Sequence, residues 1–102
     1  MSPARRKRPT RREVDATVGL LATLANPLRL QLLLALAREG ALSAGELQTR
    51  AGAEQSAVSH QLATLRKARL VSAEREGRHM IYSLLDHHVA HIVEDAFKHA
   101  TE

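Results

Sequence analysis

The sequence predicts a mostly α-helical domain with a small β-hairpin, arranged as a winged helix-turn-helix. A capping box opens a short helix at residues 44–50, and a glycine-containing turn separates it from a helix at residues 54–68. Two short strand patterns, at residues 70–75 and 79–84, follow directly. Two helices joined by a short turn with glycine are typical of a helix-turn-helix, and a hairpin placed after them predicts the wing.

The first two helices are predicted from apolar spacing and from the residues between them. Apolar residues repeat at helical spacing over residues 13–25. Asn26 and Pro27 then end that helix and begin another, because asparagine caps helices well and proline fits the first helical position. Residues 28–37 are apolar on nearly every side, so we expect this helix to be central and buried until Gly40 ends it.

The helix-turn-helix itself has clear local signals. Ser43 and Glu46 form the capping box, and Leu42 and Leu47 stand where a hydrophobic staple requires them. Gly52 lies in the turn that follows. These signals predict where the first helix of the motif begins and ends.

The rest of the chain is predicted as a hairpin and one more helix. Residues 76–78, Glu-Gly-Arg, form a tight turn between the two strands. Asp86 caps a final helix over residues 87–101, which carries an apolar stripe. A domain this small buries little of its surface, and dimerisation is a common remedy, so we expect a homodimer.

Charge is distributed unevenly along the 102 residues, whose net charge is +4. Six of the fifteen lysines and arginines lie within residues 5–12, and six more lie within residues 50–78 against three acids. This asymmetry favours a protein that binds a polyanion on one face. The alternative is a basic tail that only keeps the chain soluble. We expect residues 1–10 to be a disordered basic arm and residues 11–102 to be the domain.

Several protein classes are excluded or disfavoured by what the sequence lacks. It has no cysteine, which excludes disulfides and thiolate metal sites. No apolar run is long enough to span a bilayer, and no signal-peptide core follows the basic N-terminus, so we expect a cytoplasmic protein without membrane contact. No glycine-rich phosphate loop or nucleophile motif occurs, so we do not expect an enzyme. A small metalloenzyme that uses the histidines is the remaining enzymatic alternative.

The helix at residues 54–68 is the candidate DNA-reading element. The second helix of a helix-turn-helix places its N-terminal residues against base edges in the major groove. Gln55, Ser56, Ser59 and His60 occupy that end, and all of them can exchange hydrogen bonds with bases or phosphates. An ordinary solvated helix face is the alternative. Phosphate contacts are expected from Thr64, Arg66 and Lys67 on the helix and from Arg78 at the wing tip, where a solvent-exposed turn arginine is the alternative.

A family resemblance supports these assignments. Five short runs carry the resemblance: LANPLR at 24–29, SAVSHQL at 56–62, LRKA at 65–68 with LV at 70–71, REGR at 75–78 and YSL at 82–84. Through these runs the chain, over residues 20–101, resembles the ArsR/SmtB family of metal-sensing repressors. The resemblance implies a dimeric repressor, joined through its first and last helices, that binds an inverted-repeat operator in double-stranded DNA and releases it when its inducer binds.

Two positions depart from that family's usual pattern. Glu54 stands where a capping serine is common, and glutamate caps a helix less well. Arg69 stands where glycine often ends the recognition helix. If the backbone there is left-handed, arginine costs on the order of 1 kcal/mol.

The final helix carries a candidate metal site that one chain cannot complete. At about 100° per residue, His88 and His99 fall within about 20° of each other, at the edge of the apolar stripe. Eleven residues separate them, roughly 16 Å along a helix, whereas zinc–nitrogen bonds are about 2 Å long. In an antiparallel pair of such helices, His88 of one subunit meets His99 of the other, and twofold symmetry creates two equivalent sites.

Two carboxylates complete the predicted ligand set. Asp86 can turn toward His88, and Glu102 follows His99 at an i,i+3 spacing. Two imidazoles and two carboxylates suit zinc, and also nickel or cobalt. The family resemblance implies the same four residues, with the metal as allosteric inducer.

Other interpretations of this helix stay open. In one, Asp86 is only an N-cap and the histidines are solvated. The protein is then a winged-helix regulator without a metal site, and another signal controls it. His87 and His91, at i,i+4, are placed for a secondary site or for extra nickel or cobalt ligands. His79, in the second strand, is expected to be structural or to lie near DNA.

Overall fold

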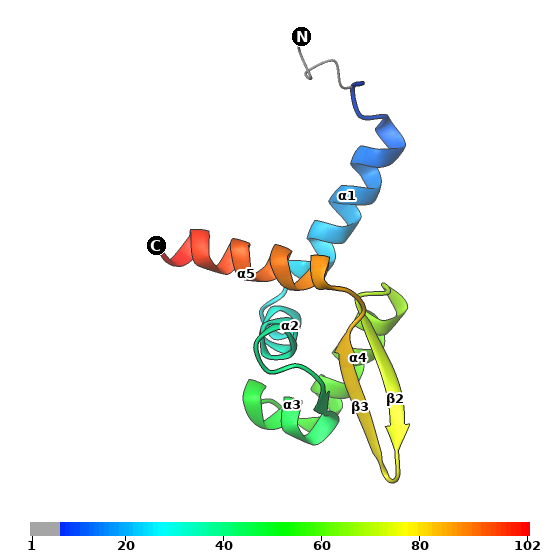
Figure 1. The fold of residues 1–102 in the computed structure, drawn as a ribbon, viewed down its shortest axis with the longest axis vertical. Coiled ribbons are helices and arrows are strands. Elements are labelled where there is room, and N and C mark those ends of the chain that lie inside the picture. Colours follow the sequence, from blue (N-terminus) through cyan, green and yellow to red (C-terminus); the bar gives the residue numbers. More distant parts are fainter. Residues whose placement is uncertain (1–6) are drawn as a thin grey trace.

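A computed structural model describes residues 7–102 of the chain, and within them it contains five helices and three strands (Figure 1). In chain order they are α1 (Arg11–Leu24), α2 (Pro27–Glu39), β1 (Leu42–Ser43), α3 (Ala44–Ala51), α4 (Gln55–Lys67), β2 (Val71–Glu76), β3 (His79–Leu84) and α5 (His87–Thr101). The five predicted helices and the two predicted strands are confirmed, each boundary within two residues of its prediction. The strand β1 is not among the predicted elements.

The first helix begins two residues earlier than predicted because of a second capping box. The hydroxyl of Thr10 accepts a hydrogen bond from the Glu13 N–H, and the Glu13 carboxylate accepts one from the Thr10 N–H. We predicted a disordered arm over residues 1–10. Residues 1–6 of it lie outside the described residues. Residues 7–10 form neither helix nor strand and lead directly into this cap.

The core gathers around α2. Leu32, Leu33 and Leu36 of this helix are buried, as its nearly continuous apolar sequence predicts. α5 crosses over α2 and packs on it through Val89 and Val93, while α3 and α4 pack on its other sides (Figure 1). The other core residues are Leu24, Leu42, Leu47, Val58, Leu62, Leu65, Leu70 and Val71. Every element except β3 therefore contributes at least one buried side chain to the core.

The helix α1 projects away from this core (Figure 1). Only Leu24, at its last turn, is buried, whereas Val14, Val18 and Leu21 are exposed. Among the described residues, no single helix is long and apolar enough to cross a membrane; α1 and α2 pass that test only when joined, and they are bent by 90° where they meet. A helix of this length with an apolar face in the open presents a surface that a single chain does not cover.

The wing is a three-stranded antiparallel sheet in the order β1-β3-β2. β2 and β3 form the predicted hairpin, with Glu76 opposite His79 and with Gly77 in the left-handed conformation at the turn. β1 pairs with the outer edge of β3, where Leu42 lies opposite Tyr82. The residue that staples α3 therefore also joins the sheet, which ties the start of the helix-turn-helix to the wing.

Candidate nucleic-acid interface and metal-ligand helix

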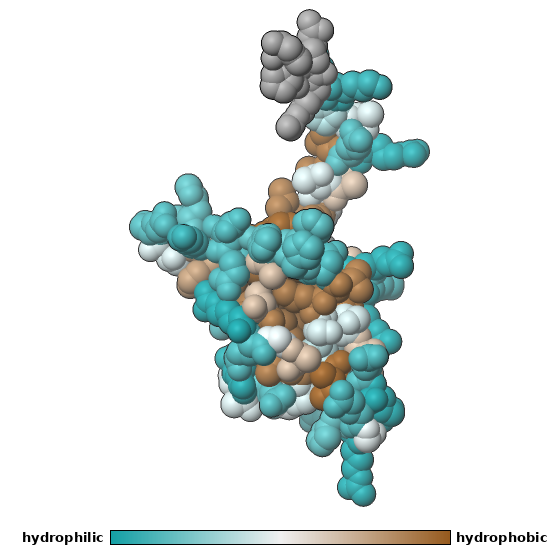
Figure 2. Space-filling model, in the orientation of Figure 1, coloured by the Kyte–Doolittle hydropathy of each residue, from teal (hydrophilic) through white to brown (hydrophobic). Residues whose placement is uncertain are grey.

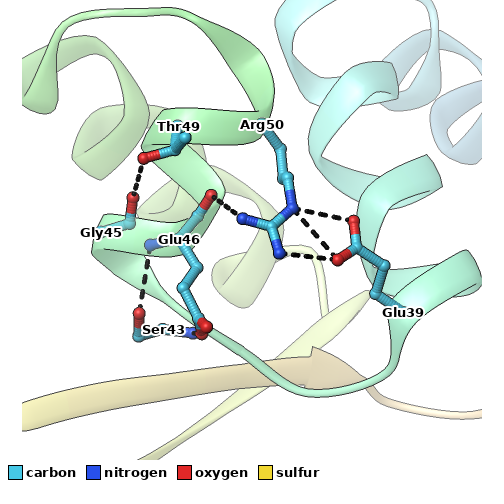
Figure 3. Close-up of polar contacts among 6 residues, drawn as sticks. All are labelled: Glu39, Ser43, Gly45, Glu46, Thr49 and Arg50. Atoms are coloured by element: carbon cyan, nitrogen blue, oxygen red, sulfur yellow. Dashed lines mark hydrogen bonds and ion pairs between the residues drawn. The ribbon is translucent and has the colours of Figure 1, made fainter.

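The helix α3 is held at both ends by polar contacts (Figure 3). At its start, the Ser43 hydroxyl accepts a hydrogen bond from the Glu46 N–H at 3.1 Å, and the Glu46 carboxylate accepts one from the Ser43 N–H at 2.8 Å. The bond from the Ser43 N–H is the main cause that holds the pKa of the Glu46 carboxyl below its usual value. At its end, Arg50 donates to both carboxylate oxygens of Glu39, the last residue of α2, with a shortest distance of 2.7 Å. The first helix of the motif is therefore fixed to the core.

The turn after α3 sets the direction of α4. Gly52 adopts the left-handed conformation that ends α3. Glu54 occupies the N-cap position of α4 without any side-chain cap bond, as its sequence departure predicts. Val58, Leu62 and Leu65 then anchor one face of α4 in the core. Because that face points inward, the opposite face of α4 points away from the body.

The predicted base-contacting residues lie on the outward face of α4. Gln55, Ser56, Ser59 and His60 are all exposed, and their spacing places them side by side. Thr64 is half-buried and donates its hydroxyl to the His60 carbonyl, so its side chain is engaged within the helix. The structure therefore presents the four predicted side chains at the N-terminal half of the candidate recognition helix.

Basic side chains lie at the C-terminal end of α4 and at the tip of the hairpin. Arg66 and Lys67 are exposed in the last turn of α4, and Arg78 is exposed at the hairpin turn. A hollow of about 340 Å³ lies between α4 and β3, and its lining includes Ser59, Arg66, Lys67 and Tyr82. The sequence did not identify Tyr82 as part of this surface, because an aromatic residue is common in any strand.

The helix α4 ends in a Schellman motif. The Leu70 N–H donates to the Leu65 carbonyl at 2.9 Å, and the Arg69 N–H donates to the Arg66 carbonyl at 3.0 Å. Arg69 has φ of 63°, and it is the only non-glycine residue with positive φ within residues 7–102. Arg69 therefore has the left-handed backbone that glycine would adopt more easily.

The four predicted metal ligands form two pairs at opposite ends of α5. Asp86 is the N-cap: its Oδ1 accepts hydrogen bonds from the N–H groups of His88 and Val89. The same oxygen lies 3.5 Å from His88 Nδ1. His99 and Glu102 are exposed at the far end of the helix. Within the described part of the chain no three histidine, aspartate or glutamate side chains come together to hold an ion.

The other histidines are also placed by the structure. The rings of His87 and His88 stack at 4.6 Å between centroids, and His91 meets His87 edge-on at 5.6 Å. His79 is exposed where β3 leaves the hairpin turn. None of these rings joins a group of three donors among residues 7–102.

An apolar groove runs between α1, α2 and α5. It has a volume of about 260 Å³ and is lined by Leu21, Leu24, Ala25, Leu30, Ile92, Val93 and Ala96. Figure 2 shows hydrophobic side chains on α1 that continue down to its junction with α5. Beyond the groove, Phe97 is 38% exposed, with the Arg38 guanidinium 4.8 Å from its ring centroid. The predicted apolar stripe of α5 is therefore buried in its first half and open in its second.

The arrangement of α3, the glycine turn, α4 and the hairpin defines a winged helix-turn-helix protein, a class that binds DNA through its second motif helix. A sequence model of the arsR family of bacterial regulatory proteins matches residues 26–73, from the cap of α2 into β2. The transcriptional repressor SmtB of Mycobacterium tuberculosis is 44% identical over 94 residues, which cover 92% of this chain and 69% of that repressor. The chain belongs to the ArsR family of helix-turn-helix transcriptional regulators.

Solved structures agree with this assignment. The crystal structure of AntR, an antimony-specific transcriptional repressor, superposes with a TM-score of 0.82 at 35% identity and covers 95% of this chain and 89% of AntR. Mb0332 from Mycobacterium bovis, a homodimeric winged helix-turn-helix DNA-binding domain, superposes with a TM-score of 0.78 at 28% identity, covering 95% and 89%. The chain spans from 61% to 74% of the length of the curated relatives it matches.

Proposed function

We propose that this chain is a metal-responsive repressor whose homodimer binds an inverted-repeat operator and releases it when divalent metal binds between paired α5 helices. Zinc is the proposed inducer, with nickel and cobalt as the alternatives. The observation that carries the proposal is the division of the ligands: Asp86 with His88 at one end of α5, and His99 with Glu102 at the other. Because the proposed function is to bind operator DNA, a cytoplasmic location is part of the proposal.

The proposed DNA contacts come from α4 and the hairpin. Among residues 7–102, ion pairs with carboxylates occupy Arg11, Arg38 and Arg50, whereas Arg66, Lys67 and Arg78 have none. Unpaired basic side chains around a helix are available to phosphates, which supply most of the affinity for DNA. The polar residues at the start of α4, Gln55, Ser56, Ser59 and His60, then read base edges.

The proposed dimer uses the apolar surface of α1 and α5. Val14, Val18 and Leu21 are exposed along α1, and the groove continues this surface onto Ile92 and Ala96 of α5. A second copy of the same surface covers both when the two α5 helices run antiparallel about a twofold axis. Mb0332 is homodimeric, which supports a homodimer for this chain.

The residues fit a metal in this arrangement. The side chains of His88 and Asp86 are 77% and 50% exposed, and only Oδ1 of Asp86 is engaged in capping α5. In the partner, His99 is exposed in the last turn of α5, and Glu102 is exposed three residues later, at the C-cap position directly after the helix. Two nitrogen and two carboxylate donors make up a tetrahedral set of the kind zinc takes.

The release of DNA follows from the packing of α5 on α2. Ligands drawn from both subunits fix the angle between the two α5 helices. Since Val89 and Val93 seat α5 on α2, and α2 contacts α3 and α4, a change in this angle reorients both recognition helices. Coupling of this kind is typically about 1–3 kcal/mol and is reciprocal, so operator DNA weakens metal binding by the same factor.

The experiment tests whether the site is shared between subunits. The full chain is titrated calorimetrically with zinc, nickel and cobalt, alone and with an operator duplex selected from a random-sequence pool. We expect about one ion per chain, and about 5–150-fold weaker binding with the duplex present. His88→Ala and His99→Ala each abolish this binding, whereas His79→Ala, at an exposed histidine on the wing, leaves it intact.

A mixture of the two inactive variants makes the test sharper. In a heterodimer of His88→Ala and His99→Ala chains, one site keeps both histidines and the other loses both. Refolding an equimolar mixture therefore restores part of the zinc binding if the ligands come from two subunits. No recovery, or equal zinc affinity with and without DNA, contradicts the proposal and favours a winged-helix regulator under another signal.

A further inference from the structure

The last turn of α1 leaves backbone carbonyls without intrahelical donors, and the Thr23 carbonyl is one of them. In a continuing helix, the Thr23 carbonyl accepts a hydrogen bond from the N–H four residues later, but that residue is Pro27, which has no N–H. The Arg29 side chain takes this place, because its Nη1 donates to the Thr23 carbonyl at 3.2 Å. Arg29 thereby connects the first turn of α2 to the last turn of α1.

The same guanidinium also reaches the candidate recognition helix. Arg29 Nε donates to Oε1 of Gln61 at 2.6 Å, a short bond between half-buried side chains that are 32 residues apart. Gln61 lies in the middle of α4, next to His60, on the side that faces the core. No carboxylate within residues 7–102 forms an ion pair with Arg29. Its planar fork is therefore committed to α1 and α4.

We infer that Arg29 and Gln61 are positioning residues for operator recognition. The Arg29 side chain holds α4 at a fixed orientation to the corner between α1 and α2. In the proposed dimer α1 lies at the interface, so this bond relates each recognition helix to the twofold axis and thus to its partner. The inference rests on the proposed function, because orientation between two helices matters only for a dimer on a two-part operator.

The geometry explains why these two residue types are needed. A guanidinium presents N–H groups in two directions within one plane, so one side chain can join two helices. A lysine ammonium is a single point charge and does not hold both acceptors in the same plane. The Gln61 amide supplies an acceptor with no charge, which leaves the positive potential of the surrounding surface unchanged.

The test compares specific with non-specific DNA binding. Gln61→Met removes the acceptor. It keeps the side chain uncharged and close to its original length. Since non-specific affinity depends on phosphate contacts, it stays unchanged at a given salt concentration. Affinity for the selected operator falls about tenfold, because restoring the orientation of α4 on binding then costs up to the free energy of one hydrogen bond to a charged group. The ratio of the two affinities, measured on dimers verified by sedimentation, therefore falls about tenfold.

Three further variants separate positioning from other roles. Gln61→Glu keeps an acceptor for Arg29, so the affinity ratio returns close to that of the unmodified chain even though both affinities fall. Arg29→Lys lowers the ratio as Gln61→Met does. Gln31→Met, at an exposed glutamine of α2, is the matched control and leaves the ratio unchanged.

Each alternative outcome overturns the inference in a recognisable way. A lower melting temperature with an unchanged ratio for Gln61→Met indicates a structural contact only. A ratio that falls with Gln61→Met but not with Arg29→Lys indicates direct base contact by Gln61. An unmodified chain that prefers no DNA sequence contradicts the proposed function itself, and that result is distinct from a selective chain whose variants remain selective.

Discussion

Replacing Arg69 with glycine at the end of α4 should stabilise the protein. This residue holds the left-handed position of the Schellman motif, with φ of 63°. The backbone bonds of the motif, from Arg69 to Arg66 and from Leu70 to Leu65, need that conformation but not its side chain. The Arg69 side chain is exposed and makes no hydrogen bond or ion pair with the rest of the described chain. Arg69→Gly therefore removes strain without removing a contact.

The expected gain follows from two opposing terms. A left-handed backbone costs an L-residue about 1–2 kcal/mol, and glycine avoids this cost. Glycine also makes the unfolded chain more flexible, which subtracts about 0.4–1 kcal/mol. The net stabilisation is about 0.5–1 kcal/mol, or roughly 2–8 °C in melting temperature for a domain of this size.

Thermal and urea unfolding at one fixed protein concentration measure this change, with two control variants. Arg69→Ala removes the same charge but keeps the Cβ atom, so its stability should stay within about 0.3 kcal/mol of the unmodified chain. Ala68→Gly acts one residue earlier, where φ is −78°, and should destabilise by about 0.5–1 kcal/mol. Equal stability of Arg69→Gly and Arg69→Ala would refute the argument, because the strain would then not be in the backbone.

Two more predictions concern α3. Leu47→Ala leaves a cavity at a fully buried position beneath the helix-turn-helix and should lower the free energy of unfolding in urea by about 2–5 kcal/mol. The control Leu85→Ala, at an exposed leucine, should lower it by less than about 0.5 kcal/mol. Similar losses for the two variants would contradict the assigned core. The bond from the Ser43 N–H lowers the pKa of Glu46 in the folded chain, so its stabilising effect is present above the unfolded value near 4.5 and is lost as pH falls below it. The stability difference between the unmodified chain and Glu46→Gln, taken from melts between about pH 7 and pH 3, should therefore shrink on acidification, and a constant difference would contradict the capping role.

The ends of the helices could be read from the sequence because their causes are local. The capping box at Ser43 and Glu46, the Asn26-Pro27 pair and the Asp86 cap each act within four residues of the helix start. The division of the candidate ligands between the two ends of α5 also follows from helical geometry alone. The capping box at Thr10 was overlooked although its signal is equally local, and this explains the two-residue error at the start of α1.

Only the tertiary structure decided which distant residues meet. The pairing of β1 with β3 joins Leu42 to Tyr82, and the bond between Arg29 and Gln61 joins two side chains that are 32 residues apart in the sequence. No local pattern marks either contact, because each depends on how whole elements pack. The sequence by itself therefore determined the five helices, the hairpin, the outward face of α4 and the spacing of the ligands, which obey local periodicity. The fold decided how α4 is held against α1 and α2, because that orientation results from side chains brought together only when the core forms.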